Sequence, residues 1–255
     1  MWCKQVWQIR GLKEQELSLL FHYSSKEGWD NESLHTQALF HQHPYDFFIA
    51  YEQQKLVGFV IALKYSDTFG FISNLLILQE FRGRGFGRKL FEYALSHLEG
   101  LQIGLDSVLG QEKLYESAGF ESYFFVSTYK FHTGSVTLPR VNIAVSNFSK
   151  KHSLKDKDAS MQELISSKET NYKAITDKEN SFALSFAYAQ GYKIHLESED
   201  INEALTLFFA LVNEHKEGTL IYLQASPLSP LLEALVQLLK MDVHSQHKRM
   251  YNFIP

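Results

Sequence analysis

The sequence predicts an α+β fold divided into two unequal domains, and three observations support this prediction. Short runs rich in aromatic and β-branched residues, which are typical of strands, alternate with segments whose apolar residues recur every three or four positions, as in amphipathic helices. A glycine-rich turn over 82–87 joins a strand to a helix. A polar, lysine-rich stretch over 149–180 separates two such series, so we expect a larger first domain and a smaller second domain.

Composition and charge narrow the class of protein. The chain has 255 residues, of which 45% are hydrophobic and 21% are charged, and its formal net charge is −4. These values are ordinary for a globular protein and argue against a nucleic-acid-binding chain, which is usually basic. The single cysteine, Cys3, excludes an intramolecular disulfide and fits a reducing compartment. Because we find no signal peptide and no apolar segment that could span a bilayer, we expect a cytoplasmic protein without a membrane partner. We expect the protein to be either a monomer or a homodimer.

In the first domain, breaks in the pattern separate the expected elements. Gly11, Gly28 and Pro44 end elements, because glycine and proline interrupt regular structure. The polar tetrapeptide 52–55 predicts a hairpin between two apolar strands. The expected elements are strand 5–9, helices 12–27 and 31–43, strands 46–51, 56–65 and 71–78, helix 86–98, strand 101–108, helix 111–117 and strand 120–131.

Three histidines lie close together in the second expected helix and its end, namely His35, His41 and His43. Asp46 is the only acidic residue near them, and no second group stands at metal-ligand spacing. We therefore interpret these histidines as surface or capping residues and expect no metal site.

The stretch from Leu75 to Leu98 carries the strongest functional signal. Glycines alternate with other residues between its strand and its helix, so the backbone can approach a ligand closely. The first turn of a helix also leaves N–H groups unpaired at the positive end of the helix dipole, which favours a phosphate. Arg82, Arg84 and Arg88 add positive charge. The alternative is a tight turn with solvated arginines. The G-x-G-x-G spacing fits neither the dinucleotide fingerprint nor the Walker motif.

Two motifs resemble those of a known family. Arg82, Gly85 and Gly87 resemble the R/Q-x-x-G-x-G/A signature of the GNAT (GCN5-related) N-acetyltransferases, and 114–120, LYESAGF, is similar to the LYEKxGF segment of that family about 30 residues downstream. The order of the expected elements over 5–131 is also the family order. The resemblance implies the GNAT fold for residues 1–133, a mixed and mostly antiparallel sheet flanked by helices, and it implies acetyl-CoA as cosubstrate.

The resemblance further implies which residues bind acetyl-CoA. The strand before the glycine loop would splay away from its neighbour, so that its free backbone groups pair with the pantetheine arm and one N–H stabilises charge on the thioester oxygen. Gln79 replaces the proline that is usual in the family, which loosens the turn without removing a donor. The implied binding residues are Leu76, Ile77 and Leu78 for the pantetheine arm, and Arg82, Gly83, Arg84, Gly85, Phe86, Gly87 and Arg88 for the pyrophosphate.

The implied reaction is direct attack of an amine on the thioester in a ternary complex. Tyr115 occupies the tyrosine position of the family, and we expect it to protonate the departing thiolate; packing on the coenzyme without proton transfer is the alternative. Asp106 is one candidate for the base, although it could equally cap the Gly110 turn. A water ordered by Ser73 and Asn74 is the other candidate.

The acceptor amine is not identified by any motif. In GNAT proteins the helical region after the first strand usually forms part of the acceptor wall, so Trp29 and Asp30 are candidate substrate contacts; the alternative is a packed tryptophan beside a helix cap. The glycine loop also fits a second function, a non-catalytic acyl-CoA-binding, sensing or assembly module.

A second series of elements follows a partly polar connector over 134–180, in which a strand over 141–145 and a helix over 159–167 are expected. The series repeats the latter part of the first domain and is similar to the tandem YitH-like GNAT subgroup, which carries a degenerate C-terminal GNAT-like domain, here 181–255. At the matching strand–helix junction the segment 197–200 is acidic and lacks glycine, so we do not expect this copy to bind coenzyme. Its expected elements are strands 181–189 and 192–197, helix 201–214, strand 219–224, helix 231–239 and strand 243–253.

Overall fold

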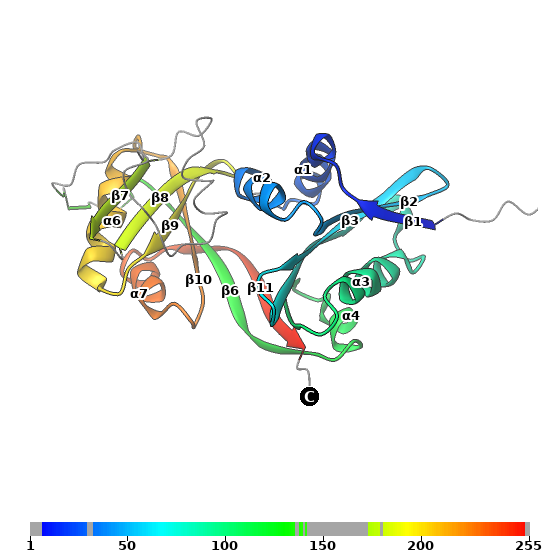
Figure 1. Cartoon of the computed structure of the whole chain (residues 1–255). Coiled ribbons are helices and arrows are strands. Elements are labelled where there is room, and N and C mark those ends of the chain that lie inside the picture. Colours follow the sequence, from blue (N-terminus) through cyan, green and yellow to red (C-terminus); the bar gives the residue numbers. More distant parts are fainter. Residues whose placement is uncertain are drawn as a thin grey trace, which may run out of the picture. The chain divides into compact units, whose positions relative to one another are not determined.

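The computed structural model describes residues 7–29, 33–135, 138–139, 141, 173–178 and 181–252 (Figure 1). The chain divides into two compact units. Unit 1 comprises residues 1–123 and 248–255, and unit 2 comprises residues 124–247. Each unit has its own hydrophobic core. This division differs from the expected boundaries at 133 and 180, because both units draw residues from β6 (Phe120–His132) and β11 (Asp242–Asn252).

Unit 1 confirms the expected α+β class. Strands β1 to β4 pair as antiparallel neighbours, and β5 joins β4 in parallel, which makes a mixed and mostly antiparallel sheet. Helices α1 and α2 lie on one side of this sheet and α3 and α4 on the other (Figure 1). The elements are β1 (Trp7–Gly11), η1 (Glu14–Glu16), α1 (Leu17–Lys26), α2 (Ser33–Gln42), β2 (Phe47–Glu52), β3 (Lys55–Lys64), β4 (Phe69–Ile77), η2 (Gln79–Phe81), α3 (Phe86–His97), β5 (Gln102–Val108) and α4 (Glu112–Glu116).

The β2–β3 hairpin forms where the polar tetrapeptide predicts it. Its two central residues, Gln53 and Gln54, have φ values of 49° and 66°, as a type I′ turn requires. At the start of β3, a Cβ atom on Gly58 would lie 2.1 Å from the carbonyl oxygen of Leu76. Only glycine therefore allows β3 to approach β4 this closely.

Strand β4 separates from β5 after four residue pairs. The parallel pairing runs from Phe69↔Gln102 to Ile72↔Leu105, whereas β4 continues to Ile77. On the other edge, the register with β3 shifts near Asn74, whose φ of +50° lies in the left-handed region that asparagine tolerates better than most residues. Such a bulge bends a strand. The expected splay of β4 away from its neighbour is thus confirmed.

Helix α3 follows the glycine loop because its apolar residues form one stripe. Phe86, Leu90, Phe91 and Ala94 recur at helical spacing and are all buried. Each large side chain buried in this way contributes about 1.5–3 kcal/mol relative to an exposed one. The stripe fixes α3 on the sheet, and so it also fixes where the first turn of α3 points.

A partly buried ion pair joins β1 to η1 and gives a prediction for stability. Arg10 donates to both carboxylate oxygens of Glu16 at 2.8 and 2.6 Å, and these hydrogen bonds lower the pKa of Glu16 to about 2. Because solvent screens the pair, we expect Glu16→Gln to lower the free energy of unfolding by about 1 kcal/mol at pH 7. Since the pKa is lowered on folding, this contribution is complete above pH 4.5, the ordinary pKa, and is lost as the pH falls through about 2.

Urea unfolding of parent and variant between pH 2 and pH 7 measures this difference. Glu14→Gln is the matched control, because Glu14 lies in the same short helix with a side chain that is 65% exposed. Its contact with His41 at 3.2 Å is screened by solvent, so we expect the substitution to change stability little. A stability difference between Glu16→Gln and the parent that stays constant down to pH 2 would contradict the assignment.

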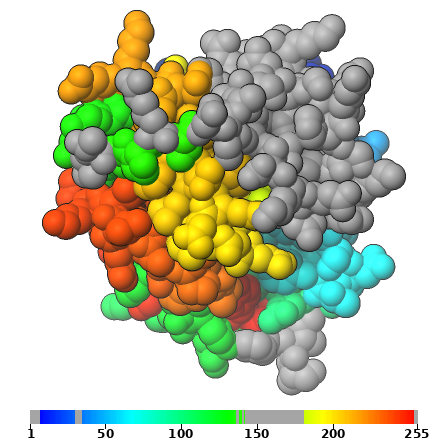
Figure 2. All heavy atoms as spheres, turned by 90° about the vertical axis from the view of Figure 1, so that its left-hand side faces the viewer, coloured from blue at the N-terminus to red at the C-terminus, as the bar shows by residue number. Residues whose placement is uncertain are grey.

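Unit 2 repeats the order of elements found in the second half of unit 1. Strands β8 and β9 are antiparallel, α6 follows, and β10 returns parallel to β9, as in the series β3–β4–α3–β5. Figure 2 shows α6 in yellow at the surface of this unit. The expected repeat is confirmed. The elements are β7 (Lys173–Lys178), β8 (Ser181–Tyr188), β9 (Gly191–Glu197), α6 (Ile201–Asn213), β10 (Leu220–Ala225) and α7 (Pro230–Leu238).

The expected connector contains a strand that the sequence did not predict. This strand, β7, lies inside the lysine-rich stretch and pairs with β8, which follows the stretch. The helix expected over 159–167 lies outside the described residues, as does all but the first residue of the strand expected over 141–145.

Candidate active site

The glycine loop owes its composition to backbone conformation. Gly83 and Gly85 have φ values of +72° and +81°, in the left-handed region, and a Cβ atom at either position would meet no atom within 4 Å. Conformation therefore requires glycine here, and crowding does not. Gly87 differs, since its φ is not positive and a Cβ atom would lie 3.6 Å from Cγ1 of Ile77, an ordinary contact. The signature that the loop resembles accepts either glycine or alanine at this last position.

The N-terminus of α3 has no cap. Gly85 is the N-cap residue and, having no side chain, it leaves the first-turn N–H groups unpaired. Among the described residues, the backbone N–H groups of residues 83–88 find no hydrogen-bond partner. Six amides in sequence, at the positive end of a helix dipole, form a site suited to an anion such as a diphosphate.

The three arginines of the loop have different partners. Arg82 forms an ion pair with Glu27 at 2.6 Å, and Arg84 forms one with Glu52 at 2.7 Å. Arg88 instead donates to Ser117 Oγ at 3.2 Å. Within the part of the chain that the structure describes, Arg88 has no carboxylate partner, so it is the arginine whose charge stays uncompensated. Its contact with Ser117 also joins the first turn of α3 to the end of α4.

The backbone N–H and C=O groups of β4 alternate between its two edges, and this alternation determines which of them are open to a ligand. The N–H of Leu78 donates to the carbonyl oxygen of Val57 on β3 at 2.9 Å, so the expectation that this N–H is free is wrong. Because successive residues of a strand direct their backbone groups to opposite edges, Ile77 directs its N–H and C=O toward the edge that β5 has left. The carbonyl oxygen of Ile77 accepts a hydrogen bond from Arg82 Nε at 2.8 Å. Its N–H is then the donor that a thioester carbonyl could use.

Tyr115 lies in α4 within an aromatic cluster. Its ring packs edge-on against Phe91 of α3 at 5.2 Å between centroids and against Phe120 at 6.5 Å. Burial raises the pKa of Tyr115. The phenol is thus protonated through the neutral pH range, but the raised pKa also makes it a weaker acid, so transfer of its proton to a thiolate depends on close positioning of the two groups.

Asp106 is held by the last strand of the chain. Arg249 of β11 donates from Nε and Nη2 to both carboxylate oxygens of Asp106 at 2.5 and 2.9 Å. Burial disfavours the charged guanidinium, but these hydrogen bonds outweigh it and raise the pKa of Arg249. The Arg249 guanidinium also lies 5.0 Å from the centroid of the Phe71 ring. A carboxylate bound on both oxygens is poorly placed to accept a proton from an amine.

The remaining candidate residues differ in position. Ser73 and Asn74 lie at the bulge of β4, on the part that has left β5. Trp29 packs against the core of unit 1, which favours the packing alternative, and its backbone N–H donates to the carbonyl oxygen of Ser24 at 3.0 Å. Asp30 lies outside the described residues.

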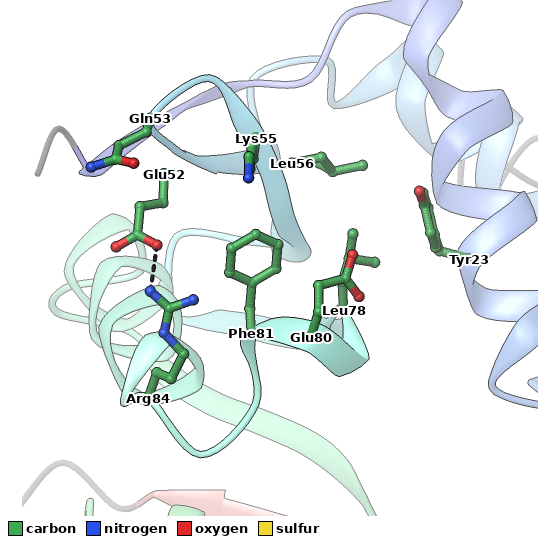
Figure 3. Close-up of a pocket in the computed structure, with 9 residues that line it drawn as sticks. All are labelled: Tyr23, Glu52, Gln53, Lys55, Leu56, Leu78, Glu80, Phe81 and Arg84. Carbon is green, nitrogen blue, oxygen red and sulfur yellow. Dashed lines mark hydrogen bonds and ion pairs between the residues drawn. The ribbon is translucent and has the colours of Figure 1, made fainter.

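A pocket of about 600 Å³ lies beside the glycine loop in unit 1 (Figure 3). Figure 3 shows Phe81 near its centre, with the paired side chains of Glu52 and Arg84 on one side and Tyr23 of α1 on the other. The Arg84 guanidinium lies 5.4 Å from the ring centroid of Phe81 and 5.0 Å from that of Phe86. These contacts hold Arg84 toward the hairpin. The lining residues are Tyr23, Glu52, Gln53, Lys55, Leu56, Leu78, Glu80, Phe81 and Arg84.

The corresponding junction in unit 2 is closed. Asp200 is the N-cap residue of α6, and its carboxylate accepts hydrogen bonds from the N–H groups of Asn202 and Glu203, both at 2.9 Å. The amides that a phosphate would need are therefore already paired with a negative group.

Two further findings concern the described residues only. No group of three or more histidine, cysteine, aspartate and glutamate side chains is gathered there as metal ligands would be. None of the helices described is both long and apolar enough to cross a membrane.

Comparison with known proteins shows what part of the chain is similar to. Residues 43–122, which include the glycine loop and Tyr115, match the model of the family described as "Acetyltransferase (GNAT) domain". Among curated proteins, holothin acyltransferase from Pseudoalteromonas is 25% identical over 123 residues. That alignment covers 48% of this chain and 42% of the relative, so the chain matches less than half of that protein.

Solved structures extend the likeness in fold to both units. A candidate acetyltransferase from Pyrococcus horikoshii is 11% identical with a TM-score of 0.76, and the match covers 100% of this chain and 92% of that one. A tandem GNAT protein from the clavulanic acid biosynthesis pathway is 10% identical with a TM-score of 0.67, over 96% of this chain and 98% of that one. The GNAT fold predicted from the two motifs is confirmed, and its tandem form has a solved counterpart.

Proposed function

We propose that the chain is an N-acetyltransferase that transfers the acetyl group of acetyl-CoA to an amine in a ternary complex. The observation that carries the proposal is the uncapped N-terminus of α3, where six consecutive amides lie unpaired, one short helical turn after a strand that has left its neighbour. The amides suit a diphosphate, and the open edge suits an extended amide-containing chain. Coenzyme A contains both groups, joined in that order.

The chemistry then assigns a task to each group. The amine nitrogen attacks the thioester carbon, the C–S bond breaks and the sulfur leaves as a thiolate. The N–H of Ile77 donates to the carbonyl oxygen as negative charge develops on it. Tyr115, which is protonated at neutral pH, gives its proton to the thiolate. The amine proton leaves through a water that Ser73 and Asn74 order at the bulge of β4.

We propose that Asp106 holds the Arg249 side chain in position and does not accept the proton of the amine. Its ion pair with Arg249 is about three-quarters buried, so removing either partner leaves the other charge without compensation. We expect Asp106→Asn and Arg249→Gln each to lower the free energy of unfolding by about 1–3 kcal/mol. We also expect each to lower kcat by no more than about 10-fold, because neither group exchanges a proton with substrate.

Chemical denaturation and steady-state kinetics of both variants and of the double variant measure this. In the double variant the effects on stability should be less than additive, as for partners in one contact. If turnover fell by about 100-fold or more in Asp106→Asn alone, with stability unchanged, Asp106 would be the base.

Release of free coenzyme A thiol, followed while the protein is incubated with acetyl-CoA and a panel of amines, tests the function. We expect turnover with at least one amine. The name of the Pseudoalteromonas relative makes holothin a reasonable member of the panel and longer acyl-CoA thioesters reasonable donors. Binding of acetyl-CoA without turnover by any amine would favour the second candidate, an acyl-CoA-binding module, which the same amides also support.

For unit 2 we propose a degenerate GNAT-like half of the kind found in the tandem YitH-like subgroup. Its α6 N-terminus is capped by Asp200 and so offers no amides to a phosphate. Coenzyme should therefore bind at a stoichiometry of one per chain.

A further inference from the structure

The carbonyl oxygen of Ile77 is occupied at the point where the coenzyme would need it. A pantetheine arm that adds to β4 as a strand must direct its amide N–H groups at free carbonyl oxygens on the open edge. Ile77 lies on that edge, five residues beyond Ile72, the last residue of β4 that pairs with β5. Its oxygen already accepts from Arg82 Nε at 2.8 Å.

Arg82 is held in this place by a second contact. Its Nη2 lies 2.6 Å from Oε1 of Glu27, a side chain that is only 28% exposed. The backbone of Glu27 is itself fixed, since its N–H donates to the carbonyl oxygens of Tyr23 and Ser24 at the end of α1. Gly28, with a φ of +71°, turns the chain directly after it. The carboxylate is thus presented from a rigid helix end.

We propose, on the basis of the function proposed above, that the Arg82–Glu27 ion pair acts as a latch, meaning that it keeps the Ile77 carbonyl oxygen occupied until the coenzyme binds. In the coenzyme-free protein Arg82 occupies the Ile77 oxygen, and Glu27 is the positioning residue that keeps it there. On binding, the pantetheine amide takes the Ile77 oxygen and the guanidinium moves to the phosphates. Exchange of one anionic partner for another keeps Arg82 paired throughout.

Glu27→Gln separates the latch from a general effect of charge. Three probes divide the coenzyme into parts: acetyl-pantetheine, which is neutral and needs the Ile77 oxygen; ADP, which carries the diphosphate with adenosine but no pantetheine arm; and acetyl-CoA. Weakening the ion pair should tighten acetyl-pantetheine and acetyl-CoA by about 3- to 5-fold, the effect of a partly exposed pair. Loss of a negative charge near the loop would by itself tighten only the charged probes.

Glu80→Gln is the matched control, because Glu80 lies on η2 close to Arg82 in the chain, whereas the carboxylate that pairs with Arg82 is that of Glu27. It removes one negative charge while leaving the latch in place, so acetyl-pantetheine should bind as it does to the parent. Arg82→Ala should change the affinities for acetyl-pantetheine and ADP in opposite directions. It frees the Ile77 oxygen and should tighten acetyl-pantetheine, and it removes a cation and should weaken ADP by about 10-fold.

Dissociation constants from ligand-observed NMR for the parent and the three variants decide the matter. If the parent binds the probes but neither Glu27→Gln nor Arg82→Ala tightens acetyl-pantetheine, the latch is wrong and the proposed function stands. If the parent binds none of the three probes, the proposed function fails and the latch fails with it.

Discussion

Replacing Gly85 with glutamate should abolish coenzyme binding, with a rise in Kd of at least about 100-fold. Gly85 has a φ of +81° and leaves the first turn of α3 uncapped. A glutamate side chain at this position would bring a carboxylate to amides that, in the parent protein, are free to bind the diphosphate. The new charge both competes for those N–H groups and repels the phosphates.

Gly100→Glu is the matched control for this experiment. Gly100 has a φ of +84°, and a Cβ atom there would also meet nothing within 4 Å, but it follows the opposite end of α3. Both substitutions place a glutamate in the left-handed region, at a cost of about 1–2 kcal/mol, so both variants should lose similar stability. Calorimetric titration with acetyl-CoA should show loss of binding in Gly85→Glu alone. If Gly85→Glu bound acetyl-CoA with the same affinity as the parent, the amides at the start of α3 would not be the diphosphate site.

Tyr115→Phe should lower kcat by about 100- to 1,000-fold while the Kd for acetyl-CoA changes less than about 3-fold. The ring is fixed by Phe91 and Phe120, and a phenylalanine keeps both contacts. The substitution therefore removes the hydroxyl proton and little else. Because burial raises the pKa of this phenol, turnover by the parent should show no fall from Tyr115 as the pH rises to about 10.

Tyr93→Phe provides the comparison, since the Tyr93 side chain lies on α3, is 36% exposed and packs on Phe48 at 5.0 Å between centroids. It removes a tyrosine hydroxyl from the same unit and should leave kcat unchanged. If Tyr115→Phe turned over as fast as Tyr93→Phe, the tyrosine would only pack against the coenzyme, and the thiolate would take its proton from water.

Local pattern was sufficient for most of the fold and for the loop. The apolar stripe of α3, the hairpin at Gln53 and Gln54 and the glycines with positive φ all depend on residues close together in the chain. Periodicity and turn chemistry report on such short-range requirements. The splay of β4 from β5 was predicted only through the family resemblance, because no local signal marks where two distant strands part.

Contacts between distant residues were not predictable. Asp106 meets Arg249, which is 143 positions away, and nothing near either residue identifies its partner. The arginines of the loop were predicted to add positive charge to the site, and the sequence did not indicate that Glu27 and Glu52 compensate two of them from other elements. Leu78 donates its N–H to Val57, a pairing that depends on the register of β3 and β4 and hence on the bulge at Asn74.

The crystal structure of the protein with acetyl-CoA tests the central claim most directly. We predict diphosphate oxygens about 3 Å from the N–H groups of residues 85–88, and the thioester sulfur between Ile77 and the hydroxyl of Tyr115. A diphosphate bound elsewhere on the chain, with the amides at the start of α3 still unpaired, would contradict the account.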